Sequence, residues 1–166
     1  NRPHEAIEIA KKATTLFSSN HLFFGLLADI YSEIGNFICA ETNYKKAISI
    51  APQDDETIYG YVNFLMGIGD KKKSIDFLQK IIKINKYHSM SYYSLSRLIN
   101  PKESIFTDQI INLNLNNFQD NYNKYNILFS KSHIFHSLKD FKKSADLLVK
   151  ANELKLKDKP SNINKV

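Results

Sequence analysis

Two histidines are the side chains in this sequence that come closest to a recognisable chemical site. His133 and His136 are three residues apart, so on a helix both imidazoles face the same side and offer two nitrogen ligands to a metal ion. No carboxylate or thiol accompanies them at helical spacing on that helix, and the single cysteine, Cys39, is distant in the sequence. We therefore expect no metal site and no cofactor.

Three consecutive acidic residues, Asp54, Asp55 and Glu56, form a second arrangement with possible chemistry. Neighbouring carboxylates can act as a general acid and base, but these three stand where a helix is expected to begin, and acidic side chains there stabilise the helix dipole. The five glycines lie within or between expected helices, and the sequence contains neither G-x-x-x-x-G-K-[ST] nor G-x-G-x-x-G. We predict no catalytic residue, and hence no enzyme activity, in this stretch of chain.

The formal charge of +6 raises the question of nucleic-acid binding. Every basic residue except Arg2 and Arg97 is a lysine, whereas base-edge and bidentate phosphate contacts rely mainly on arginine. Paired lysines such as Lys45 and Lys46 fall on expected second helices, which should form an outer, solvated surface. We expect no specific nucleic-acid partner. No apolar run approaches the ~20 residues of a membrane span, and a single cysteine suits a reduced, cytoplasmic setting.

The elements that would position side chains are clearest between His21 and Asp54. Two amphipathic helices are expected there, joined by a turn at Gly35 and Asn36 and ended by Pro52. Small residues at Ala28 and Ala40 would let the two helices approach closely. The apolar and small positions that define this hairpin are Phe24, Leu27, Ala28, Tyr31, Ala40, Tyr44 and Ala47. One hairpin cannot bury both of its faces, so further copies are expected.

Counted from His21, those residues and Pro52 occupy positions 4, 7, 8, 11, 20, 24, 27 and 32 of a 34-residue unit, which closely resembles the tetratricopeptide repeat. The resemblance implies an all-α fold, an α-α superhelix (solenoid) of stacked antiparallel helical hairpins with about nine helices. Residues 1–156 would form this superhelical domain, and 157–166 a polar tail or the start of a linker. The expected parts are the second helix of a truncated repeat (1–20), two repeats (21–54 and 55–88) and two divergent repeats (89–120 and 121–156).

Irregular features are expected in the second half of the chain. Asn100 and Pro101 should end one helix early, and residues 102–117 should form a short partner helix capped by either Ser104 or Thr107. In the last hairpin, Lys131 occupies a place where an apolar residue is expected, so the helix would face water there.

The resemblance also implies a concave groove lined by the first helix of each hairpin. Aromatic rings beside hydrogen-bonding side chains suit an extended peptide, and Arg97 next to Tyr93 suits an acidic or carboxylate-bearing one. We therefore predict a non-catalytic protein-interaction module with a protein or peptide partner. The residues expected to face the groove and bind are Asp29, Tyr59, Asn63, Tyr93, Arg97, Phe129 and His133. A solvated groove of a spacer segment is the plain alternative.

A narrower resemblance covers residues 90–155. The order of a helix ending in L-I-N-P, a D-Q-I-I-N-L-N-L segment and a closing A-N-E-L-K is similar to the repeat region that precedes the catalytic domain in repeat-sulfotransferase fusions. This resemblance implies an alternative function, in which the chain positions an acceptor for a sulfotransferase domain downstream of Val166.

Overall fold

The computed structural model describes the backbone of residues 2–158 and the side chains of residues 4–158. Within this range the chain is all-α, with nine α-helices, one short 3-10 helix and no β-strand. The helices are α1 (Arg2–Leu16), α2 (His21–Glu33), α3 (Phe37–Ile50), α4 (Asp55–Gly67), α5 (Lys71–Ile84), α6 (Ser89–Leu98), α7 (Phe106–Ile111), η1 (Leu115–Asn117), α8 (Asn121–Ser137) and α9 (Phe141–Asp158). They form two compact units, Asn1–Ile84 and Asn85–Val166.

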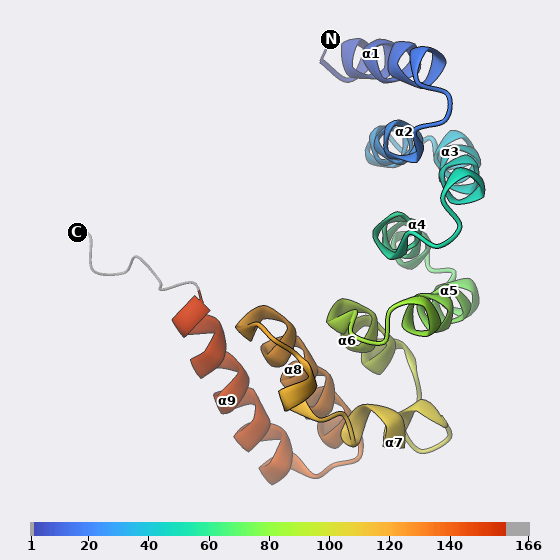
Figure 1. Cartoon of the computed structure of the whole chain (residues 1–166). Helices are drawn as coiled ribbons and strands as arrows, with labels where there is room; N and C mark the ends of the chain where they lie inside the picture. The colour runs from blue at the N-terminus through green and yellow to red at the C-terminus, as the bar shows by residue number, and fades with distance from the viewer. Residues whose placement is uncertain (1, 159–166) are drawn as a thin grey trace. The chain divides into compact units, whose positions relative to one another are not determined.

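The first unit is built from α1 and two antiparallel hairpins, α2 with α3 and α4 with α5 (Figure 1). The predicted turn at Gly35 is confirmed and a second one occurs at Gly69, since these glycines adopt positive φ angles of 77° and 80°. In each turn the amide after the glycine donates to a carbonyl five residues earlier, Asn36 to Tyr31 and Asp70 to Leu65. This is the usual way to satisfy carbonyls at a helix C-terminus, and it requires the left-handed residue that glycine supplies most easily.

The N-termini of α3, α4 and α5 are each capped by the side chain of the residue that precedes the helix. The Asn36 side chain accepts from the Cys39 amide, Asp54 from Thr57 and Asp70 from Lys73. The expectation that a helix begins at Asp54 is thus confirmed, and Asp54 is the N-cap of α4. Each hairpin therefore begins and ends its helices with local signals that the sequence carries.

The core of the first unit depends on small and aromatic residues at the predicted places. Ala28 and Ala40 have no exposed surface, and the buried rings of Tyr44, Tyr61 and Phe64 pack against them. The Tyr44 centroid lies 5.5 Å from that of Tyr61 and 5.4 Å from that of Phe64, which suits favourable tilted contacts. The rings of the second hairpin therefore complete the packing that the first hairpin begins.

The second unit departs from regular hairpins near Pro101, as predicted. Helix α6 ends at Leu98 and α7 has only six residues. Neither Ser104 nor Thr107 is the N-cap of α7, because Ile105 occupies that position and makes no side-chain cap bond. The Ser104 hydroxyl, just before the cap, accepts from the Phe106 amide. The Thr107 hydroxyl is directed elsewhere and donates to the Pro101 carbonyl. The proline thus shortens one helix, and a threonine fixes the loop that follows it.

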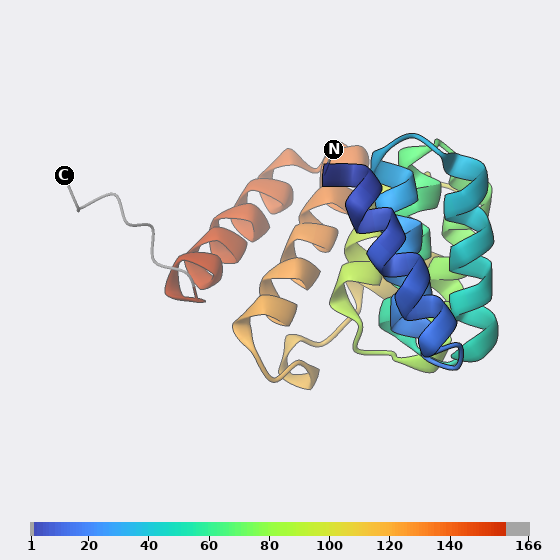
Figure 2. The same ribbon diagram turned by 90° about the horizontal axis from the view of Figure 1, so that it is seen from above.

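Helices α8 and α9 lie side by side in both views of the chain (Figures 1 and 2). At their contact, the hydroxyls of Ser132 and Ser144 donate to each other's backbone carbonyls at 2.9 and 3.0 Å. These serines are twelve residues apart, like Ala28 and Ala40, so small side chains occupy equivalent places in both hairpins. The connecting turn places Lys139 at a φ of 66°, where the first unit uses glycine.

Two local expectations need correction. Lys131 is half-buried, and its ammonium donates to the Leu113 carbonyl at 2.6 Å, so it holds the segment between α7 and η1 instead of facing water. Helix α9 continues through Lys157 and Asp158, which had been assigned to the polar tail. The remainder of that tail, residues 159–166, lies outside the described residues. None of the described helices is both long and apolar enough to cross a membrane.

Candidate functional site

The predicted binding residues fall into two sets, one in each unit. Asp29, on α2, and Tyr59 and Asn63, on α4, belong to the first unit. Tyr93 and Arg97, on α6, and Phe129 and His133, on α8, belong to the second.

In the second unit, cationic groups lie over aromatic rings. The Arg97 guanidinium carbon is 5.7 Å from the centroid of the Tyr93 ring, and the Tyr93 and Phe129 centroids are 6.4 Å apart. The Lys155 ammonium lies 5.9 Å from the Phe129 centroid. We call Tyr93, Arg97, Phe129 and Lys155 the cationic aromatic cluster. At these distances each cation is attracted to the ring face while its N–H groups stay available to a ligand.

Lys155 was absent from the predicted site. It falls within residues 121–156, the last expected repeat, but on a second helix, whereas the predicted contacts were taken from first helices. Helix α9 packs on α8 and brings the Lys155 ammonium to the Phe129 ring. The signal that could have identified it is the apolar periodicity of α9, which runs on to the partly buried Leu154. A helix through Leu154 also carries Lys155 into reach of α8.

His133 is partly buried and lies close to Arg97 of the cluster. Burial lowers the pKa of the His133 imidazole, and the nearby positive charge of Arg97 lowers it further. Its Nδ1 atom is buried without a hydrogen-bond partner among the described residues. His136 is exposed, and the centroid of its imidazole lies 5.3 Å from that of the Phe141 ring. Residues 2–158 contain no group of three or more His, Cys, Asp or Glu side chains arranged to hold a metal ion.

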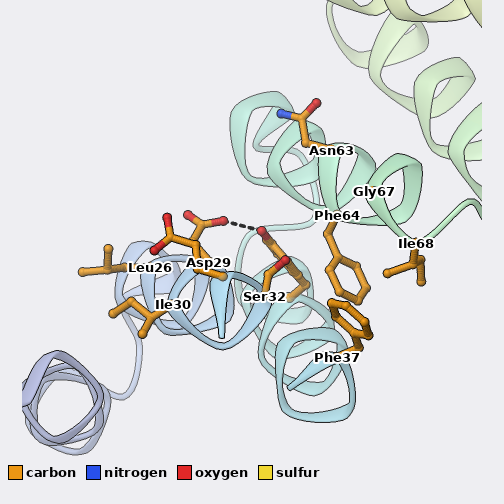
Figure 3. A pocket seen from close by; sticks show the side chains of 11 residues that line it. Leu26, Asp29, Ile30, Ser32, Phe37, Asn63, Phe64, Gly67 and Ile68 are labelled. Carbon is orange, nitrogen blue, oxygen red and sulfur yellow. Dashed lines mark hydrogen bonds between the residues drawn. The ribbon is translucent and has the colours of Figure 1, made fainter. Parts of the chain in front are cut away.

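The first unit contains a pocket of about 620 Å³ formed by α2, α3 and α4 (Figure 3). Two predicted residues, Asp29 and Asn63, line it, whereas Tyr59 does not. The complete lining is Leu26, Asp29, Ile30, Ser32, Glu33, Phe37, Tyr44, Asn63, Phe64, Gly67 and Ile68. Figure 3 shows the rings of Phe37 and Phe64 facing each other on one side of the pocket.

Asp29 is fixed at this pocket by a hydrogen bond from the Tyr44 hydroxyl, drawn as the dashed line in Figure 3. Burial is the main cause that raises the pKa of Tyr44 far above its usual value, and the bond to Asp29 and its charge raise it further. Tyr44 therefore stays a hydrogen-bond donor throughout the physiological pH range. The Asp29 carboxylate keeps one oxygen beyond this bond for a ligand.

Sequence reasoning missed the apolar walls of the pocket. The prediction considered only groove-facing positions within first helices, whereas Phe37 begins a second helix and Ile68 is the C-cap residue after a first one. Both are large apolar residues beside a turn, and this could have marked them as exposed. Phe37 and Ile68 are 51% and 42% exposed.

Comparison with known proteins finds the same fold in several solved structures. Residues 23–54 match the family model described as tetratricopeptide repeat, and a search of curated protein sequences finds no match. The crystal structure of MamA is similar with a TM-score of 0.64 and 19% identity, over 92% of this chain and 88% of that one. The crystal structure of YrrB, described as a TPR protein with an unusual peptide-binding site, is similar with a TM-score of 0.61 and 14% identity, over 93% of this chain and 78% of that one. A Podosopora anserina protein with nearly identical TPR-like repeats is similar with a TM-score of 0.68 and 12% identity, over 96% of this chain and 90% of that one. At these identities the likeness concerns the fold.

Proposed function

We propose that this chain, a member of the tetratricopeptide repeat family, is a non-catalytic module that binds a segment of a partner protein. The stacked helical hairpins and the likeness to a peptide-binding protein of the same fold support a role in protein interaction. The first-helix residues Asp29, Tyr59, Asn63, Tyr93, Arg97, Phe129 and His133 are the proposed contacts.

The observation that carries the proposal is the cationic aromatic cluster. Among residues 2–158, Arg97 takes part in no ion pair, and its guanidinium is exposed over the Tyr93 ring. A carboxylate could accept two parallel hydrogen bonds from it, while the part-exposed rings of Tyr93 and Phe129 offer flat apolar contact. An acidic or carboxylate-bearing segment is therefore the proposed partner for this cluster.

A pull-down from cells that express this protein tests the proposed function. The double variant Tyr93→Ala/Arg97→Ala should lose partners that wild-type protein retains, because each anchor is worth roughly 1–2 kcal/mol on truncation. Lys86→Ala/Tyr87→Ala is the matched control, since the Lys86 ammonium lies 5.0 Å from the Tyr87 ring in the same unit. If the two double variants retain the same partners as wild type, the cluster is not the binding surface.

The role as an accessory region of a sulfotransferase stays a prediction that rests on the resemblance of residues 90–155. It is tested by reading the parent gene beyond Val166. A phosphate-binding loop followed by a sulfotransferase domain would favour it.

A further inference from the structure

The pocket of the first unit is acidic although the chain as a whole is basic. Asp29 and Glu33 line it, and none of its eleven lining residues is Lys, Arg or His. The full sequence has a formal charge of +6. Two carboxylates in a lining without a cationic side chain attract positive charge. This pocket therefore favours a positively charged ligand, whereas the cationic aromatic cluster suits a negatively charged one.

The walls of the pocket are apolar and remain accessible. Leu26 and Phe37 are each 51% exposed and Ile68 is 42% exposed. The centroids of Phe37 and Phe64 are 6.2 Å apart with the rings tilted by 58°, so they form a wall with an exposed aromatic edge. A volume of about 620 Å³ is within the range of pockets that hold ligands, and it exceeds the space that one side chain fills.

We infer that this pocket binds a lysine or arginine of a partner segment together with an adjacent apolar side chain, an inference that rests on the proposed function. The methylene stem of a lysine or arginine would lie against Leu26 and Ile30 while its charged end reaches Asp29. The apolar neighbour would fill the space beside Phe37 and Ile68. The hydroxyl of Tyr44 holds Asp29 in place before the partner arrives, which reduces the entropy lost on binding.

Selection from a phage-displayed library of random dodecapeptides against the whole chain tests the inference. Peptides enriched on wild-type protein should share a Lys or Arg next to Leu, Ile or Phe. A synthetic peptide of the enriched sequence should bind, by fluorescence anisotropy, at least tenfold more tightly than the same peptide with norleucine in place of its lysine. Norleucine keeps the apolar stem and removes only the charge.

Isosteric variants then locate the site. Asp29→Asn/Glu33→Gln should weaken the selected peptide at least tenfold, and the amide oxygen introduced by Asp29→Asn would still accept the bond from Tyr44, so the fold is retained. Asp76→Asn/Glu103→Gln, which neutralises two exposed carboxylates outside the pocket, should leave binding unchanged.

Four results would overturn the inference. Enriched peptides without a shared basic residue, or equal binding by wild type and Asp29→Asn/Glu33→Gln, would show that the pocket is not the cation site. If those peptides instead lose affinity on Tyr93→Ala/Arg97→Ala, the inference fails while the proposed function stands. If no peptide is enriched, both fail.

Discussion

Replacement of Ala40 by leucine is the most direct test of the packing described for the first unit. Ala40 has no exposed surface, and it lies among Ala28, Tyr44, Tyr61, Phe64 and Leu65, all of them buried. If space were free there, three additional carbons would stabilise the chain by ~2 kcal/mol, at ~0.8 kcal/mol for each buried methylene. Because the site is filled, we expect overpacking instead, with a loss of ~1–3 kcal/mol in the free energy of unfolding.

Urea unfolding followed by circular dichroism measures this change. Ala145→Leu is the matched control, since Ala145 is an exposed helical position and the substitution is the same. The midpoint should fall for Ala40→Leu, with an unchanged dependence on urea, and should stay constant for Ala145→Leu. An Ala40→Leu protein as stable as wild type, or more stable, would refute the assignment of Ala40 to a tight helix contact.

Three further predictions concern single side chains. Tyr44→Phe should lower the free energy of unfolding by ~1 kcal/mol, because it removes the hydroxyl that donates to Asp29. Asp29→Asn should lower it less, because the amide oxygen still accepts this bond, and urea unfolding of the two variants measures the difference. Lys139→Gly should stabilise the chain by ~0.5–1 kcal/mol, because Lys139 has a positive φ of 66°; an unchanged unfolding midpoint would contradict this. Burial is the main cause that lowers the His133 pKa in the folded chain, so as the pH falls the unfolded chain takes up this proton at a higher pH than the folded chain does. The free energy of unfolding should therefore decrease as the pH drops below about 6.5. That fall should be smaller in His133→Asn but should persist in His4→Asn, in which an exposed histidine is replaced.

The regular hairpins were predictable because their signals are local. A left-handed glycine at position 35 or 69 both ends one helix and sets the next, and a side-chain cap follows one residue later. Ala28 and Ala40 mark the contact because only small residues allow two helices to approach so closely. The 34-residue spacing of these signals therefore specified the elements of the first unit.

The second unit was less predictable because its stabilising contacts are distant in sequence. Lys131 interrupts an apolar pattern, and nothing near it in the chain shows that the Leu113 carbonyl, eighteen residues earlier, will accept its ammonium. Likewise, the turn at Lys139 lacks the glycine that marks the other turns, yet the Asp140 amide donates to the Phe135 carbonyl as its counterparts do. Tertiary packing of α8 on α9 outweighs the local cost of a left-handed lysine.

The pocket was the least predictable feature, because a hollow depends on how far apart helices stand and not on which residues face it. Gly67 lines the pocket, and a methyl group added there would meet no atom within 4 Å, so this position is open. The packed rings of Tyr44, Tyr61 and Phe64, with centroids 5.4 to 6.0 Å apart, fill the contact between α3 and α4 beside the pocket and keep these helices apart. Tyr44 has a second effect, since its hydroxyl extends from this aromatic core to Asp29. One residue thus helps to set the spacing of the helices and orients the carboxylate that gives the pocket its charge.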